Sequence, residues 1–353
     1  MKINPERVEL VRKRLGLNKN NLAEILGVDR KTLQRLRDEG EATELLLREL
    51  VSISGYPEAF FFKPDPVLPN PMGVSFRSLR SLSARSREAA LAAASHAFEL
   101  DEWVRMRIQL PNHAIPQFSQ DAPREAALAL RASWGMGVKP IANMVNILES
   151  HGIRVFSLVE ETRHLDAYAY WLDEAPYVFL NTYKTSEHSR FDAAHELGHI
   201  VMHRHSGTTQ RDAEHAANSF ASEFLMPQAD LLAYAGRVQT LPDLVRAKHR
   251  WGVSAAALNF ALHKVGLIRD WQYKNNCIEM NRAGRTNEPE GMQRETSQIW
   301  SKVLTIFWQS GITLDRIAEG VSLPASELTK LLFNISAPSR VVARREPQFR
   351  LVS

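Results

Sequence analysis

Helical periodicity dominates the pattern of hydrophobic and polar positions along the chain. In most long segments the apolar residues recur at spacings of three and four, as expected for helices that bury one face. The sequence therefore predicts a mostly helical α+β protein. Helices are predicted at residues 5–16, 18–26, 30–38, 43–54, 86–106, 121–134, 140–152, 241–250, 254–265, 314–320 and 324–332, and two more between residues 190 and 227.

Three short segments between these helices follow a different pattern. They are rich in β-branched and aromatic residues and are separated by polar or proline-containing turns, which predicts strands. The segments are Arg154–Val159, Ala167–Leu172 and Tyr177–Asn181. We expect them to form a small antiparallel sheet, whose edge could accept an extended peptide through main-chain hydrogen bonds. The polar stretch Asn275–Gln298 is predicted to be a loop or linker.

The first forty residues contain a pattern typical of a DNA-binding motif. Residues 22–33 read L-A-x-x-L-G-V-x-x-x-x-L, which resembles the lambda-repressor-like (XRE) helix-turn-helix. Gly27 would allow the tight turn, and Asp29 can cap the following helix. That helix would enter a major groove and present Arg30, Lys31, Gln34 and Arg35 as candidate DNA-binding residues.

The charge of this unit is compatible with a phosphate footprint. Residues 1–40 hold ten basic and six acidic residues, a net charge of +4, and the whole chain also has a net charge of +4. Such units also serve as protein-docking modules with a solvated charged face. The unit departs from its relatives at Leu36-Arg37, where family members often have Trp-Glu. We expect DNA binding, with docking or dimerisation as the alternative.

Length and composition exclude several classes of protein. At 353 residues the chain is too long for one ordinary core, so two or three domains are expected. No apolar run approaches the ~20 residues of a membrane span. The charged N-terminus is unlike a signal peptide. The single cysteine, Cys277, permits no internal disulfide, as is usual in a reducing cytoplasm, and excludes a zinc site built from several cysteines.

The strongest chemical signal is the H-E-x-x-H motif of residues 195–199. On a helix, His195 and His199 lie one turn apart on the same face, where both can reach one Zn²⁺ at about 2.0–2.1 Å. Glu196 would lie beside the metal without binding it and would take a proton from the attacking water. This combination is typical of a hydrolase rather than of a structural zinc site.

The third metal ligand is predicted on the next helix. Glu214 opens an apolar-periodic segment that ends at Pro227, and it would complete a two-histidine, one-carboxylate set. Asn218, one turn later on the same face, could orient a histidine ligand from outside the coordination sphere. Zn²⁺ is the expected metal, although Mn²⁺ or Fe²⁺ also suits this donor set.

Three other residues compete with Glu214. His203 would lie about 12 Å from His195 along a continuous helix, too far to share its metal. His205 has the spacing of the third histidine in metzincins, but Met202 stands where that geometry requires glycine. Glu223 lies more than two turns beyond Glu214. We therefore rank Glu214 first and His205 second.

The residues around the motif also resemble those of a known family. Five-residue matches to H-E-x-x-H do occur by chance, but here RFDAAHELGH is followed by E-x-x-A-N-x-F-A-x-x-F-L-M-P. The combination resembles the ImmA/IrrE family of intracellular zinc metallopeptidases, which often carry a helix-turn-helix domain and cleave a helix-turn-helix repressor. The resemblance implies His195, His199 and Glu214 as metal ligands and Glu196 as the catalytic glutamate.

These observations predict the domain organisation and two rival functions. We expect a helix-turn-helix domain (1–65), a linker and helical arm (66–120), a zincin-like metallopeptidase domain (121–235) and a helical C-terminal region (236–353). The first functional hypothesis is a cytoplasmic endopeptidase that cleaves a partner repressor or antitoxin, binds DNA through its N-terminal domain and can form a homodimer. The second is a DNA-binding regulator or antitoxin whose peptidase-like domain senses or docks. An intact Glu196 favours the enzyme, because a sensor needs no general base.

Overall fold

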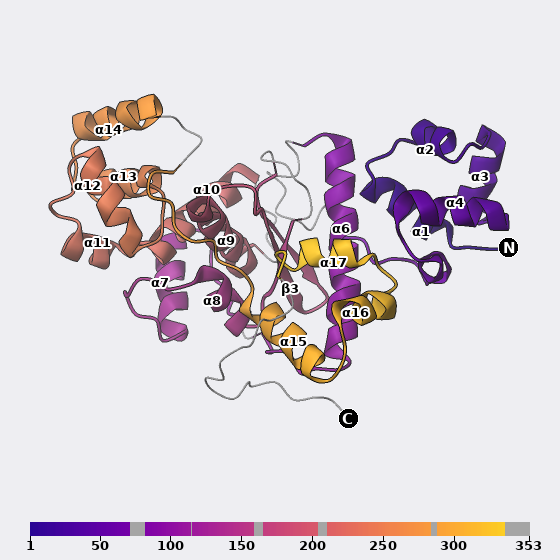
Figure 1. Ribbon diagram of the computed structural model, residues 1–353. Helices are drawn as coiled ribbons and strands as arrows, with labels where there is room; N and C mark the ends of the chain where they lie inside the picture. The colour runs from indigo at the N-terminus through magenta and orange to yellow at the C-terminus, as the bar shows by residue number, and fades with distance from the viewer. Residues whose placement is uncertain (71–81, 114, 159–164, 204–209, 284–287, 336–353) are drawn as a thin grey trace.

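The computed structural model describes residues 1–70, 82–113, 115–158, 165–203, 210–283 and 288–335. The molecule is elongated (Figure 1): the N-terminal helices occupy one end, a helical subdomain occupies the other, and a small sheet lies between. The fold is mostly helical α+β, as the periodicity predicts. In the described part of the chain, no helix has both the length and the apolar character needed to cross a membrane.

Most helices and the three strands lie at predicted segments, but α11 and α15 were not predicted, and α8 begins at Met144 rather than at residue 140. The helices before the sheet are α1 (Pro5–Arg14), α2 (Lys19–Ile25), α3 (Arg30–Asp38), α4 (Glu44–Ser54), η1 (Glu58–Phe62), α6 (Ala84–Arg105), α7 (Pro123–Ser133) and α8 (Met144–Ser150). The strands are β1 (Arg154–Ser157), β2 (Tyr168–Leu172) and β3 (Ala175–Leu180). They are followed by α9 (Ser186–Met202), α10 (Gln210–Leu225), α11 (Gln228–Tyr234), α12 (Leu241–Ala247), η3 (Lys248–Arg250), α13 (Ala255–Lys264), α14 (Asp270–Ala283), α15 (Gln298–Gln309), α16 (Leu314–Val321) and α17 (Ala325–Leu331).

The sheet is mixed rather than antiparallel, which corrects the prediction. The strand order is β1-β3-β2; β3 pairs antiparallel with β2 but parallel with β1. The burial of the strands agrees with this pairing. All four residues of β1 and residues 176–180 of β3 are buried, whereas the last three residues of β2 are partly exposed. The parallel pair is thus the buried part of the sheet, and β2 is its more exposed edge.

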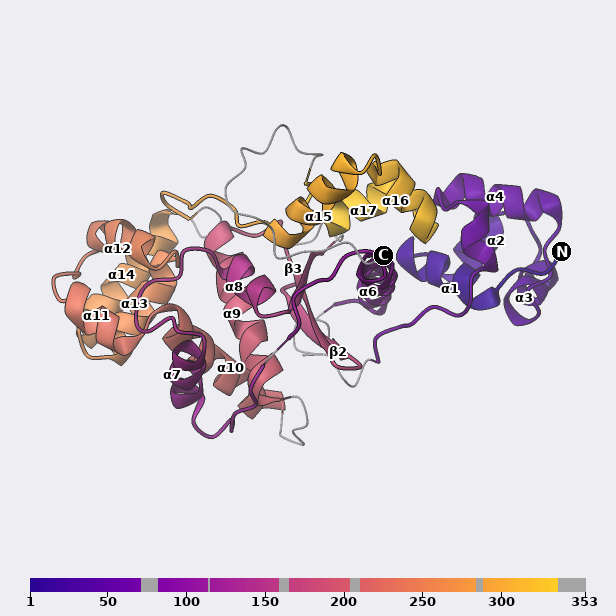
Figure 2. The same cartoon turned by 90° about the horizontal axis from the view of Figure 1, so that it is seen from below.

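The two faces of the sheet carry different side chains. Phe156, Tyr168, Tyr177 and Phe179 belong to the core that includes α6, whereas Val155, Ala169, Val178 and Leu180 belong to the core that includes α9. This alternation is the period of two expected for a strand buried on both sides. Seen from below (Figure 2), the sheet separates α6 from α9 and α10. The aliphatic and alanine face is thus the one that supports the helix of the H-E-x-x-H motif.

In the N-terminal unit, α2 and α3 lie at the two segments that the sequence analysis predicted to be helical. Asn18 caps α2 and Asp29 caps α3, and Gly27 between them has φ +62°, a left-handed conformation that glycine adopts without strain. Leu33 and Leu36 bury the inner face of α3.

The N-terminal unit is also joined to the last helices of the chain. The Arg14 guanidinium pairs with Glu327 of α17, with 2.7 Å between Nε and Oε2. Lys63 Nζ donates to the main-chain oxygen of Val321 at 2.8 Å. The N-terminal unit is therefore attached to the rest of the protein by contacts with the C-terminal helices as well as by the chain that follows it.

The region predicted to be a loop, Asn275–Gln298, is only partly one. Residues 275–283 complete α14, because Asn276 is buried and its amide bonds Asn259 of α13 at 3.0 Å. Residues 288–297 contain no helix or strand; we call them the strap, since they run across the start of α9 to α15. Hydrogen bonds and ion pairs of its polar side chains fix the strap to the rest of the fold. The same polar composition led the sequence analysis to predict a linker.

One buried carboxylate fixes the start of α15 after the strap. Glu149 of α8 is 1% exposed and accepts hydrogen bonds from the Ser297 hydroxyl, from Gln298 N at 2.9 Å and from Ile299 N at 3.0 Å. The first N–H groups of a helix have no partner within the helix, so an external acceptor stabilises it. Glu149 thereby couples α8 to the C-terminal helices.

Replacing Glu149 tests this coupling. In Glu149→Ala one hydroxyl and two main-chain N–H groups lose their acceptor in a buried site, so the free energy of unfolding should fall by roughly 2–4 kcal/mol. Chemical denaturation measures the change. Glu149→Gln, which keeps one acceptor oxygen, should lose less; equal losses for both variants would mean that the hydrogen bonds are not the source of the stability.

Candidate metal centre

The motif of residues 195–199 lies in the middle of α9, where the helix is most deeply packed. Thr185 caps the helix with its hydroxyl, and Ala193, Ala194 and Leu197 are fully buried against the sheet and neighbouring helices. The helical spacing places both histidines on one face. Their Nε2 atoms are 3.0 Å apart.

The crossing of α9 and α10 brings the third donor to these histidines. A Cβ atom at Gly198 would lie 3.1 Å from the Phe220 ring and 3.2 Å from the Ala217 Cα, so only glycine permits this approach without displacement. The close contact places the first turns of α10 beside the motif. The glycine of the motif is therefore a packing requirement of the centre.

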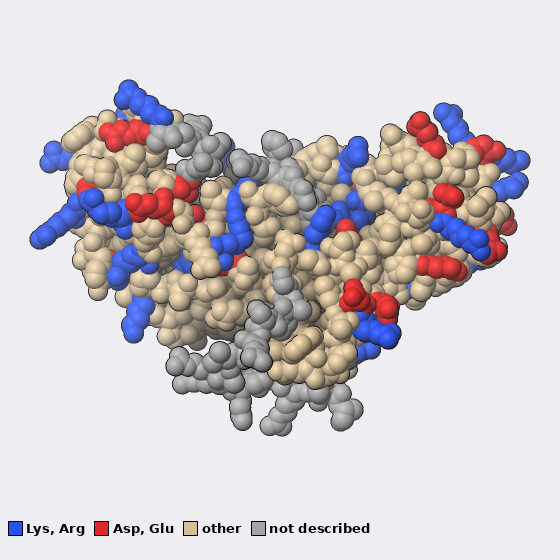
Figure 3. All heavy atoms as spheres, in the orientation of Figure 1, with Lys and Arg blue, Asp and Glu red and all other residues tan. Residues whose placement is uncertain are grey.

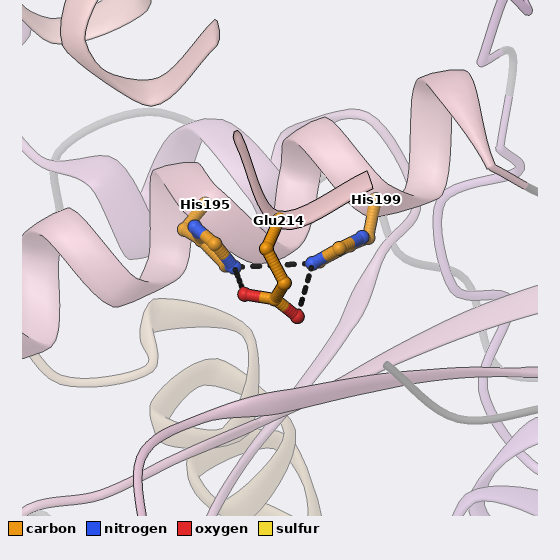
Figure 4. A group of neighbouring side chains, drawn as sticks. All are labelled: His195, His199 and Glu214. Atoms are coloured by element: carbon orange, nitrogen blue, oxygen red, sulfur yellow. Dashed lines mark hydrogen bonds and ion pairs between the residues drawn. The ribbon is translucent and has the colours of Figure 1, made fainter. Parts of the chain in front are cut away.

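Glu214 completes the cluster from α10 (Figure 4). Its Oε2 lies 3.4 Å from His195 Nε2, and its Oε1 lies 3.6 Å from His199 Nε2. The donor atoms of the three side chains lie within 4.8 Å of one another. Glu214 and His199 are buried and His195 is half-buried. The structure thus brings together the three residues that the sequence analysis ranked first as ligands.

Two further side chains orient the histidines. Asn218 Oδ1 lies 3.0 Å from His195 Nδ1, as expected if that nitrogen donates its proton and leaves Nε2 free to bind a metal. His203 Nδ1 lies 3.0 Å from His199 Nδ1. The sequence analysis proposed Asn218 for this role but considered His203 only as a rejected ligand. The i, i+4 spacing of His199 and His203 was the signal that could have revealed the pair.

Burial keeps His199 and His203 neutral, as a metal ligand and its partner must be. Burial, with the neighbouring His195 and His203, lowers the pKa of His199 well below its usual range. Burial also lowers the pKa of His203 to about 4. At His195 burial acts in the same direction, but the hydrogen bond to Glu214 and the charge of Glu196 outweigh it and raise the pKa.

The donor set fits a zinc ion. Two neutral imidazole nitrogens and one carboxylate are a catalytic zinc set that leaves a position for water or substrate. The donor atoms of the three side chains converge on one point, and the Asn218 amide contacts Nδ1 of His195. Metal sites typically have both features: a set of ligands and hydrogen-bond partners that orient them. The same donors also suit Mn²⁺ or Fe²⁺.

The other ligand candidates lie elsewhere. Glu223 accepts from the Arg124 guanidinium at 2.9 and 3.0 Å and from Gln228 N, so its carboxylate is engaged away from the cluster. His205 lies outside the described residues. Two other polar residues of this segment, Arg190 and His215, do not belong to the cluster either. Arg190 is buried against Glu295 and the Ile141 carbonyl, and His215 is exposed.

A second cluster lies one turn before the motif. Asp166, His188 and Asp192 also place ligand atoms within 4.8 Å of one another. Lys184 already pairs with Asp166, and its Nζ lies 3.1 Å from His188 Nε2, so a cation occupies this cluster. Burial raises the pKa of Asp192 to about 7, although Lys184 opposes the shift. This second group therefore serves better as an ion-pair cluster than as a metal site.

The comparisons with known proteins point to the same segment of the chain. Residues 148–263, about a third of the chain, match the family Peptidase_M78, described as the IrrE N-terminal-like domain. The matched segment contains the sheet, α9, α10 and all three metal donors. It supports the resemblance to the ImmA/IrrE family and a metallopeptidase-type domain, and it does not include the N-terminal unit. No curated protein matches the chain.

The choice of Glu214 over Glu223 is open to direct test. Glu214→Ala removes one of three donors, so the purified protein should retain little metal, measured by inductively coupled plasma mass spectrometry. Glu223→Ala, a buried carboxylate on the same helix, should keep its metal. Metal retained by Glu214→Ala but lost from His205→Ala would transfer the third ligand to His205.

The orienting residues should have a smaller effect than the ligands. Asn218→Ala and His203→Ala should each weaken metal affinity by about 10–100-fold, because the ligand ring loses the partner that fixes its tautomer and orientation. Competition with a chromogenic chelator measures the affinity. His215→Ala, an exposed histidine on α10, is the matched control and should leave it unchanged; equal affinities for all variants would remove the orienting role.

Proposed function

We propose that this chain is a zinc-dependent endopeptidase that cleaves a partner protein. The observation that carries the proposal is the convergence of His195, His199 and Glu214 on one point, with Glu196 on the same helix. Residues 148–263, which supply all four, match a peptidase family. A purely structural zinc site usually has four protein ligands. It has no use for a carboxylate such as Glu196 beside the metal.

The roles of the protein residues follow from their positions. When bound, Zn²⁺ would polarise the scissile carbonyl and make a water molecule more acidic. Glu196 is 4% exposed and lies next to His195 in the helix. A buried carboxylate there can accept the proton of the attacking water and later deliver it to the leaving amine. His195 and His199, oriented by Asn218 and His203, would hold the metal.

We propose a helix-turn-helix repressor or an antitoxin as the substrate. The support is the resemblance to the ImmA/IrrE family, whose members typically act on such proteins. Cleavage of a protein that itself binds DNA would explain a DNA- or partner-binding unit in the same chain as the peptidase. A cytoplasmic location would fit this substrate class and the single cysteine.

We further propose that α3 is the DNA-reading helix. Arg30, Lys31, Gln34 and Arg35 are all exposed on its outer face. The space-filling view (Figure 3) shows acidic and basic side chains side by side on the N-terminal end, so this face of the molecule has no continuous basic patch. A footprint confined to α3 would suit a short contact in one major groove.

Glu196→Gln tests the peptidase. The variant should keep its metal, because the histidine donors remain, and should lose about 10²–10⁴-fold in cleavage rate, because the general base is gone. Cleavage is followed by mass spectrometry with helix-turn-helix proteins encoded beside this chain as substrates. Glu319→Gln, an exposed glutamate of α16, should cleave like the wild type.

The outcomes separate the two functional hypotheses. Metal in both proteins with cleavage only by the wild type supports the endopeptidase and names its substrate. Metal in both with no cleavage by either favours a regulator whose peptidase-like domain senses or docks. Little metal in either contradicts the site itself.

Combined Lys31→Ala and Arg35→Ala substitutions test the DNA-binding unit. If both side chains contact phosphate, the slope of log affinity against log salt should decrease in magnitude by about 1.8, as about 0.9 is expected for each contact. Fluorescence anisotropy with DNA from upstream of the coding sequence provides the measurement. Arg246→Ala with Arg316→Ala, two exposed arginines outside the unit, should leave the slope unchanged. Absence of binding by the wild type at low salt would favour docking.

A further inference from the structure

The last three described helices repeat the first three at a constant distance along the sequence. Helix α2 begins at Lys19 and α16 at Leu314, while α3 begins at Arg30 and α17 at Ala325. Both pairs of residues are 295 positions apart, and the ends of α1 and α15 are separated by the same number. The two segments can therefore be compared position by position without a gap. We call residues 3–40 the first copy and residues 298–335 the second copy.

The turn between the last two helices of each copy has the same backbone conformation. Gly27 and Ser322 are 295 positions apart, and both have a left-handed φ, of +62° and +57°. A residue other than glycine rarely adopts this conformation, so its presence at Ser322 indicates that the turn requires it. A main-chain hydrogen bond of 3.0 Å closes each turn at matching positions, from Val28 N to the Ala23 oxygen and from Leu323 N to the Ala318 oxygen.

The two copies also bury the same positions. Asn18 and Thr313, again 295 positions apart, cap the helix before the turn with their side chains. Five apolar positions of the last two helices are buried in both copies. The pairs are Leu22 with Ile317, Ala23 with Ala318, Leu26 with Val321, Leu33 with Leu328 and Leu36 with Leu331. Agreement in the cap, the turn and the core at one spacing indicates that both copies have the same arrangement of helices.

The copies differ at the positions that the first copy is proposed to present to DNA. The outer face of α3 carries three cations and a glutamine, whereas the matching face of α17 carries a single cation. The four pairs are Arg30 with Ala325, Lys31 with Ser326, Gln34 with Thr329 and Arg35 with Lys330. The first copy holds nine basic and six acidic residues, and the second holds three of each. The second copy therefore lacks the excess of positive charge that phosphate contacts require.

A further difference between the copies lies where the second one meets α6. Gly320 stands at the position of Ile25, which is 47% exposed in the first copy. A Cβ atom at Gly320 would lie 2.6 Å from Nε1 of the Trp103 indole on α6, so a larger residue does not fit without a shift. Glycine is a poor helix former, so its presence here follows from the close contact with α6 rather than from the needs of the helix.

Charged groups join the second copy to the N-terminal unit directly. The Arg14 guanidinium of the first copy forms two hydrogen bonds with the Glu327 carboxylate of α17, at 2.7 and 3.3 Å. Their side chains are only 10% and 16% exposed. Lys63 donates at 2.8 Å to the carbonyl of Val321, which ends α16 and has no partner within that helix. The second copy thus uses α17 and the end of α16 for contacts with protein.

We propose that α15–α17 is a copy of the N-terminal three-helix unit that binds protein in place of DNA, and that its partner is the N-terminal unit of the same chain. The idea that the first copy reads DNA rests on the proposed function, whereas the repeat and the docking do not. Figure 2 shows α15–α17 between the sheet and the N-terminal helices. Because the Trp300 indole of α15 bonds the Val155 carbonyl of β1, the second copy joins the N-terminal unit to the sheet that supports α9.

Hydrogen exchange of the intact protein tests the docking, with peptides from α1–α4 as the readout. Glu327→Arg places two arginines opposite each other, so the N-terminal unit should open more often and its amides should exchange about tenfold faster. Arg14→Glu should have the same effect. The combined Arg14→Glu and Glu327→Arg protein restores the pair with exchanged charges and should exchange nearly as slowly as the wild type.

Three further measurements separate docking from a general loss of stability. Peptides from α9 and α10 should exchange at the wild-type rate in every variant. Arg316→Glu reverses a charge on α16 whose partner, Glu319, is also exposed, and it should leave exchange in α1–α4 unchanged. Gly320→Ile gives the second copy the residue of the first, and it should speed exchange in α16 and α17 because the new side chain collides with Trp103.

A separate measurement asks whether α17 binds DNA. Ser326→Ala combined with Lys330→Ala should leave the salt dependence of DNA binding unchanged, whereas a phosphate contact by Lys330 would make the slope smaller by about 0.9. Fluorescence anisotropy with the DNA used for the Lys31 and Arg35 variants provides the comparison. The exchange measurement uses no DNA, so it decides the docking even if the wild type binds none.

Three results would overturn the proposal. The first is unchanged exchange in α1–α4 for both single charge reversals, which would mean that the second copy does not hold the N-terminal unit. The second is faster exchange that the combined variant fails to restore, which would place the effect outside the pair. The third is a smaller salt slope for the combined Ser326→Ala and Lys330→Ala protein, which would make α17 a helix that contacts DNA.

Discussion

The close crossing of α9 and α10 is the contact on which the candidate metal centre depends. Two of the three donors come from one helix, so their separation is set by helical geometry alone. The third comes from the other helix, and it reaches the histidines only because Gly198 allows the Phe220 ring and the Ala217 backbone within about van der Waals distance. A larger residue at 198 would separate the helices and move Glu214 away from the two histidines.

The sheet and the C-terminal helices fix where that crossing lies. One face of the sheet is aliphatic and packs against α9, while the aromatic face packs against α6 and α15. The Trp300 indole of α15 donates to the Val155 carbonyl of β1 at 2.9 Å, and Tyr177 donates to the buried Asp101 of α6 at 2.8 Å. The two faces of the sheet thus pack against different parts of the chain.

Local pattern was sufficient to predict most of the helices and the three side chains that converge at the candidate metal centre. Helical periodicity, caps such as Asp29 and Thr185, and the spacing of His195 and His199 are properties of short segments, and the folded chain keeps them. The parallel pairing of β1 with β3 was not predicted, because strand order depends on contacts between segments that are distant in the sequence. The helical part of 275–283 was missed for a similar reason: Asn276 looks solvent-exposed in sequence but bonds Asn259 in a buried contact.

The buried charged residues around the start of α9 are a further feature that local sequence pattern does not predict. Nothing near Glu187, Arg190 and Lys248 in the chain indicates that these three residues are buried. Their partners, Glu288 and Glu295, lie roughly forty to more than a hundred residues away, on a strap whose composition resembles a linker. A buried ion-pair network of this kind is weak support for stability, because desolvation offsets much of the attraction. Apolar side chains would pack the same space more simply. What the charged pairs provide is position: they join the strap and η3 to the start of α9, the helix that carries the two histidines.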